Sequence, residues 1–173
     1  YQLRTLFSKV LIEIRGDYLN TFEKSSQDLI KKMLVKEQCD LAEDYSDRLH
    51  VETIGRLANF SDEDIDWITK HSSAQGSVDF AASVGTMLDA NQRAKMLMER
   101  VGCLTEQHDK SPLMNTLSRQ LIDAGIEDNI RSRTDFVIAL MLLGGDTISG
   151  TLTVGIAEFL DQNDGVLVSE DWS

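Results

Sequence analysis

Apolar residues recur every three or four positions along most of this chain, the spacing that places them on one face of a helix. The pattern predicts a series of helices, at residues 2–15, 18–35, 51–58, 61–72, 81–104 and 111–121. A long helix near residues 129–160 completes the series, and its segment 136–143 is apolar throughout, as in a helix buried on most sides. No strand pattern alternates with these helices, so we expect a mainly α fold, an orthogonal multi-helical bundle in one domain spanning residues 1–173.

Capping residues and glycines predict where several helices begin and end. Ser61 is expected to cap a helix whose first turn, 62–64, is acidic, because carboxylates favour the positive end of the helix dipole. Ser111 followed by proline predicts a second start, and Gly16 and Gly125 predict helix ends. Two stretches are expected to be non-helical: a short extended piece at 39–45 and a loop at 72–78, which is rich in serine and glycine.

The charge balance limits the classes of partner. The chain of 173 residues has 17 Lys and Arg against 29 Asp and Glu, a net charge of -12. This excess disfavours binding to nucleic acid phosphates and to anionic membranes. The long apolar stretch contains acidic residues and threonines, and no amino-terminal signal pattern is visible, so we expect a cytoplasmic protein.

Two cysteines, Cys39 and Cys103, lie far apart and have neither a Cys-x-x-Cys partner nor a neighbouring histidine. The spacing therefore predicts neither a disulfide framework nor a metal site. Free cysteines are often buried, so both are expected as small core residues.

The most unusual chemistry lies inside the long apolar helix, where two glycines precede a carboxylate and a hydroxyl. Each glycine costs about 1 kcal/mol relative to alanine, so Gly144 and Gly145 indicate either close packing of another group or a local opening of the helix. Asp146 and Thr147 follow directly and form a candidate proton relay. The alternative is a purely structural role, in which Thr147 bonds its own backbone and Asp146 forms an ion pair.

This run, 142–150, resembles the oxygen-activating segment of the long central helix in cytochrome P-450 monooxygenases, where an acid-threonine pair follows a small residue and a glycine. Segments with similar counterparts in that family precede it in the same order, at 3–9, 39–45, 49–57, 61–72 and 111–121. His50 stands where proline is common in the family. The resemblance covers nearly the whole chain, from helix C to just past helix I in the family's lettering.

The resemblance implies a function and a set of site residues. It implies a haem cofactor, a small organic substrate that receives one oxygen atom from O2, and an electron-transfer partner of the ferredoxin or flavoprotein type. Asp146 and Thr147 would deliver protons as catalytic residues. Cofactor contacts would come from Arg4, Gly144 and Gly145, with Arg4 at a haem propionate, and Leu140 and Leu143 would line the substrate side.

Several departures from the family pattern limit this implication. Leu143 replaces the usual small residue, and the Glu-x-x-Arg pair and the cysteine haem loop are absent. Haem in this family is held by a cysteine thiolate, and neither Cys39 nor Cys103 has a comparable setting. We therefore expect a fragment of a longer enzyme that is not competent alone, with exposed apolar helices that favour dimerisation. The alternative is a haem-free scaffold or accessory binding protein.

Overall fold

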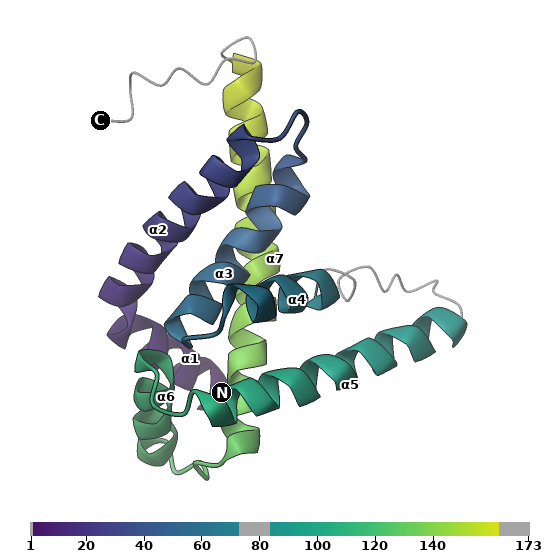
Figure 1. Cartoon of the computed structure of the whole chain (residues 1–173). Coiled ribbons are helices and arrows are strands. Elements are labelled where there is room, and N and C mark those ends of the chain that lie inside the picture. Colours follow the sequence, from purple (N-terminus) through teal and green to yellow (C-terminus); the bar gives the residue numbers. More distant parts are fainter. Residues whose placement is uncertain (1, 73–83, 163–173) are drawn as a thin grey trace.

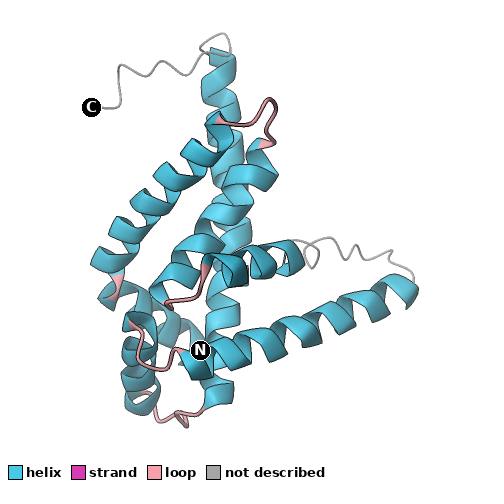
Figure 2. Ribbon diagram, viewed as in Figure 1, coloured by secondary structure: helices cyan, strands magenta, loops and turns pink. Residues whose placement is uncertain are grey.

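Seven α-helices and a π-helical turn make up the described part of the chain (Figure 1). The computed structural model describes residues 2–72 and 84–162, with all their side chains except those of 2–3, 84–90 and 143–149. The elements are α1 (Gln2–Glu13), α2 (Arg15–Leu34), the π-helical turn η1 (Ala42–Ser46), α3 (Asp47–Leu57), α4 (Asp62–Ser72), α5 (Val84–Gln107), α6 (Pro112–Asp123) and α7 (Ile130–Gln162). Figure 2 shows only helices and loops across these residues, which confirms the mainly α class.

An apolar cluster joins six of these helices. Its buried side chains include Leu6 and Val10 of α1, Val51 and Ile54 of α3, Ile65 and Ile68 of α4, Val101 of α5, Leu117 of α6, and Phe136 and Val137 of α7. Helix α3 packs against both α2 and α7 (Figure 1). Burying each large aliphatic side chain contributes about 1.5–3 kcal/mol, so this cluster fixes how the helices meet.

Two predicted helix starts and one predicted end are confirmed. The Ser61 hydroxyl accepts the Asp64 amide at 3.2 Å and donates to the Asp64 carboxylate at 2.6 Å, at the start of α4. The Ser111 hydroxyl accepts the amide of Met114 at 3.3 Å, at the start of α6. Gly125 has a φ of 69°, the left-handed conformation that closes a helix at low cost for glycine.

The expected end at Gly16 is wrong. The helix breaks at Ile14, and Gly16 lies in the first turn of α2. Ile14 is buried in the apolar cluster, and its amide still bonds to the Val10 carbonyl at 3.0 Å. The helix boundary therefore coincides with the buried residue Ile14, and packing in the core accounts for it better than the flexibility of Gly16.

The extended piece expected at 39–45 is also wrong, because most of it is helical. Asp40 accepts the amides of Ala42 and Glu43 at 2.8 and 3.0 Å, which caps a helical segment that leads through η1 into α3. Helix α3 therefore begins earlier than the expected residue 51. Of the loop expected at 72–78, Ser72 is instead the last residue of α4, and 73–78 lie outside the described residues.

Both cysteines are exposed, which contradicts their expected place in the core. On α5, Val101 and Leu104 are buried in the apolar cluster. Cys103 lies between them in the sequence but on a different face of the helix, so its side chain is exposed to solvent. Cys39 lies in the connection after α2, where the neighbouring residues are also exposed.

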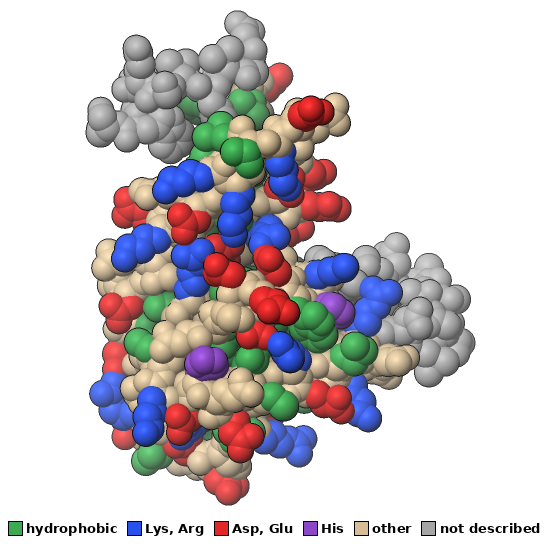
Figure 3. Space-filling view, in the orientation of Figure 1, with side chains coloured by type: hydrophobic (Ala, Val, Ile, Leu, Met, Phe, Trp, Pro, Cys, Tyr) green, Lys and Arg blue, Asp and Glu red, His purple; other side chains and the backbone are tan. Residues whose placement is uncertain are grey.

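Helix α7 is unbroken through Gly144 and Gly145, so the backbone gives no sign of the expected local opening there. None of the described helices is both long enough and apolar enough to cross a membrane. On the face seen in Figure 3, acidic and basic side chains are interspersed over the described helices.

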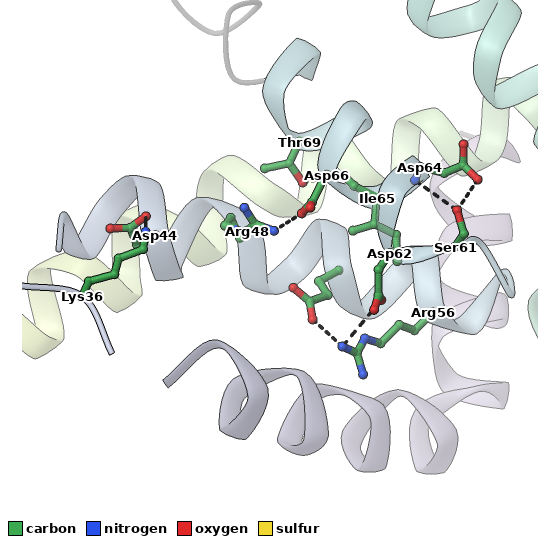
Figure 4. Close-up of polar contacts among 11 residues, drawn as sticks. Lys36, Asp44, Arg48, Arg56, Ser61, Asp62, Asp64, Ile65, Asp66 and Thr69 are labelled. Carbon is green, nitrogen blue, oxygen red and sulfur yellow. Dashed lines mark hydrogen bonds and ion pairs between the residues drawn. The ribbon is translucent and has the colours of Figure 1, made fainter. Parts of the chain in front are cut away.

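Helices α3 and α4 approach each other closely and are linked by ion pairs (Figure 4). Arg48 of α3 pairs with Asp66 of α4, and Arg56 lies 3.9 Å from Asp62. Between these pairs, a Cβ placed on Gly55 would lie 2.6 Å from the Cγ1 atom of Ile65. Glycine is therefore needed at this position for the two helices to meet.

We expect Gly55→Ala to destabilise the protein by about 1–3 kcal/mol, because the added methyl group overpacks a buried contact. The matched control is Gly16→Ala in α2, where nothing lies within 4 Å of the added carbon. That change should be neutral or stabilising by up to about 1 kcal/mol, through helix propensity. Urea unfolding followed by circular dichroism measures both, and equal effects of the two variants would contradict the close α3–α4 approach.

Candidate functional site

An apolar groove of about 960 Å³ runs between α1, the start of α2, α3, the end of α6 and the first half of α7. Its size lies at the upper end of the range for small-molecule sites. Most of its lining is aliphatic or aromatic: Leu6, Phe7, Leu11, Leu19, Leu121, Ile126, Phe136, Ala139 and Leu140. The polar lining residues are Arg4, Arg15, Tyr18, His50, Ser132 and Asp135. The groove therefore suits a largely apolar ligand that meets a few polar groups.

Helical spacing explains which residues face the groove. On α1, Arg4, Phe7 and Leu11 follow one another at intervals of three and four and line the same wall. Phe7 stacks on Phe136 of α7, with ring centroids 4.4 Å apart and planes inclined by 17°. Beyond the bend at Ile14, α2 continues the same wall, so the groove follows α1 and α2 on one side and α7 on the other.

His50 is the most buried polar side chain of the groove, with 3% of its surface exposed. Its Nε2 atom lies 2.8 Å from the carbonyl oxygen of Leu140, and its Nδ1 atom lies 3.0 Å from the Tyr18 hydroxyl. A carbonyl oxygen only accepts, so Nε2 carries the proton in this contact. In the neutral ring Nδ1 is then an acceptor, and the Tyr18 hydroxyl must donate to it.

Burial keeps both groups uncharged. It lowers the pKa of His50 below its ordinary value of 6.5, and the hydrogen bond to the Leu140 carbonyl offsets only part of this shift. Burial also raises the pKa of the Tyr18 hydroxyl above 10.0. The pair is therefore a neutral imidazole and a neutral phenol around pH 7, and the Tyr18 hydroxyl donates its proton to His50.

The charged groups of the groove lie at exposed positions. Arg4 and Arg15 are both exposed and form no ion pair with any described residue. Asp135 of α7 also lines the groove, and its carboxylate is 3.9 Å from the Arg131 guanidinium. Arg4 and Arg15 therefore remain available to an anionic group at the rim of the groove.

Two of the sequence-predicted site residues meet in this groove. Arg4, the expected cofactor contact, and Leu140, the expected substrate contact, both line it. Leu140 is also part of the apolar cluster, so it serves the core as well. The remaining five, Leu143, Gly144, Gly145, Asp146 and Thr147, continue α7 beyond Leu140, and their side chains lie outside the described residues.

The sequence analysis did not identify Tyr18 and His50 as site residues. They lie 32 positions apart, and His50 lies 90 positions from Leu140, so no local spacing connects them. One sequence feature could have pointed to His50: it stands where proline is common in the family that the sequence resembles.

No protein-family model, curated protein or solved structure matches this chain. Any function must therefore be argued from the groove and the resemblance of the sequence.

The stability contributed by His50 should disappear as the pH falls. Because its pKa is lowered in the folded protein, the unfolded chain takes up the proton first, and the contribution is complete above pH 6.5 and lost below it. In His50→Gln the amide can still donate to the Leu140 carbonyl and accept from Tyr18, but it does not titrate. We expect the variant to lose less unfolding free energy than the wild type between about pH 7 and pH 5. Urea unfolding across this range measures the difference, and parallel curves would contradict the neutral buried state of His50.

Proposed function

We propose that this chain is the central helical part of a cytochrome P-450-type monooxygenase, which inserts one O2-derived oxygen atom into a small organic substrate. The observation that carries the proposal is the meeting of Arg4 and Leu140 in one apolar groove. The resemblance assigns these two residues, which lie far apart in the sequence, to the cofactor and to the substrate. Their common groove is what such an assignment requires.

The groove fits part of the requirements of a haem. Its aliphatic and aromatic walls, including the stacked Phe7 and Phe136, suit a flat apolar ring, and the guanidinium of Arg4 suits a carboxylate at the rim. When bound, the haem supplies the redox chemistry of its iron. The thiolate ligand does not fit, because Cys39 and Cys103 are exposed and neither lines the groove. The proposal therefore requires a thiolate from another part of the parent enzyme.

The chain's own residues would bind, orient and move protons. In the proposal Arg4 holds a carboxylate of the cofactor, and Leu140 and Leu143 confine the substrate. Gly144 and Gly145 leave room beside the helix, because they carry no side chain. Asp146 and Thr147 follow less than two helical turns beyond Leu140, and they would supply a carboxylate and a hydroxyl that can hold and pass protons on the substrate side.

The partners in this proposal are a small organic substrate and an electron donor of the ferredoxin or flavoprotein type, in the cytoplasm. Self-association of the isolated chain through apolar helices also belongs to it. Ile12, Leu34 and Val35 support this part, because they are 73%, 78% and 85% exposed. Apolar surface of this kind favours contact with another apolar face.

A second candidate function is a haem-free module that binds an apolar molecule. It is favoured by one observation: no cysteine is among the residues that line the groove in the described part of the chain. A binding module would use the same apolar walls and the neutral Tyr18–His50 pair without any iron.

Titration with haemin separates these two functions. If the groove accepts haem, Arg4→Ala should weaken haemin binding by up to about fivefold, since it removes an exposed ion pair. Lys9→Ala is the matched control, because Lys9 is an exposed cation of α1 that does not line the groove. Absorbance of the bound haemin measures affinity, and equal binding by all three proteins would mean that the groove does not hold haem through Arg4.

The reduced, haemin-loaded chain should show no carbon monoxide spectrum of the thiolate-bound type, because the two cysteines are exposed and away from the groove. Cys39→Ser and Cys103→Ser should leave that spectrum unchanged. A thiolate-type band lost in either variant would contradict the position of the cysteines.

In the complete enzyme, Thr147→Ala should increase the share of electrons that are consumed without product, because a hydroxyl of the proton path is lost. Electron consumption and product formation measured together give this ratio. The control is Thr151→Ala, one turn further along α7 and outside the acid-threonine pair. An unchanged ratio in Thr147→Ala would remove this residue from the proposed proton path.

A further inference from the structure

We propose that Tyr18, held by His50, is the polar recognition element of the groove, and that it selects apolar ligands that carry a hydrogen-bond donor, such as an alcohol or a phenol. The inference rests on the proposed use of the groove as a ligand site. It adds the chemical class of the ligand and a specificity-determining residue that the resemblance does not supply.

The direction of hydrogen bonding decides what Tyr18 can offer. The Leu140 carbonyl fixes the proton of His50 on Nε2, and Nδ1 then takes the single proton of the Tyr18 hydroxyl. The phenol oxygen keeps accepting capacity but has no second proton to give. A ligand group that meets this oxygen must therefore donate.

The pair is held in place before any ligand arrives. Tyr18 lies on α2, His50 on α3 and Leu140 on α7, so three helices fix the geometry of one hydrogen-bonded chain. His50 is almost fully buried, which prevents water from competing for its ring nitrogens. A preorganised acceptor loses little freedom on binding and therefore discriminates well between ligands.

The other polar groups of the groove are Arg4, Arg15, Ser132 and Asp135, and none of them takes part in the hydrogen-bonded chain of Tyr18, His50 and Leu140. Arg15 lies about one turn before Tyr18 on α2, whereas Arg4 lies on α1. A ligand without an anionic group therefore tests Tyr18 apart from the two guanidinium groups.

A matched pair of ligands tests the proposal with the full 173-residue chain. The compounds are 2-naphthol, which donates and accepts, and 2-methoxynaphthalene, which only accepts on a nearly identical apolar skeleton. Calorimetric titration at pH 7.5 measures both dissociation constants. Tyr18→Phe should weaken the binding of 2-naphthol about fivefold, the effect of one net hydrogen bond, and leave 2-methoxynaphthalene within about twofold.

Two further variants separate recognition from structure. His50→Leu frees the Tyr18 proton, so the binding of 2-methoxynaphthalene should become stronger relative to that of 2-naphthol. Tyr45→Phe is the matched control, because the Tyr45 hydroxyl bonds to Ser26 at 2.9 Å and does not line the groove. It should change neither constant. Circular dichroism verifies folding, and if His50→Leu does not fold, the Tyr18→Phe comparison decides.

The outcomes distinguish the inference from the proposed function. If neither compound binds to the wild type, the inference is overturned, and the haemin titration decides the proposed function separately. If both bind, and the ratio of their constants is the same in the wild type and Tyr18→Phe, the inference alone is overturned. A ratio that falls in Tyr18→Phe and is retained in Tyr45→Phe supports it.

Discussion

A buried imidazole is the constraint on which the groove depends. His50 must satisfy two ring nitrogens away from water, and an unpaired polar atom at such a place costs about 1–3 kcal/mol. The Tyr18 hydroxyl and the Leu140 carbonyl satisfy both, which ties α2, α3 and α7 together where they line the groove. Because one partner is a carbonyl, the arrangement also sets the tautomer of the ring. A requirement of stability thus determines the chemical character of the groove wall.

The bend at Ile14 belongs to the same arrangement. Arg4 and Phe7 before it, and Tyr18 after it, all line the groove. At roughly 100° per residue Phe7 and Tyr18 are separated by about 20° beyond three full turns, so helical spacing alone places them on one face. The break at Ile14 therefore preserves this face, while Ile14 itself enters the apolar cluster.

Local signals predicted the helices better than their boundaries. Serine caps at Ser61 and Ser111 were readable because a cap involves residues only three positions apart. The cap at Asp40 was equally local but was hidden by a segment of mixed character. The helix end predicted at Gly16 was wrong because the helix breaks at Ile14, where a core contact has more effect than the flexibility of a nearby glycine. The prediction for Cys103 was wrong because the burial of a helical residue depends on which face of the helix it occupies. The residue type gives only the average burial of all cysteines.

The site could be predicted only where sequence order carried information. Arg4 and Leu140 were found through the resemblance, which preserves order along the chain, whereas the Tyr18–His50 contact arises only when three helices pack. These two kinds of residue give the groove unlike polar groups: exposed guanidinium groups and a neutral, half-buried acceptor that is held by a buried imidazole. An exposed cation attracts anions through water and discriminates weakly, whereas an acceptor fixed by its neighbours discriminates by geometry. Attraction and selection would therefore reside in different side chains, and a change at a guanidinium can alter affinity without altering specificity.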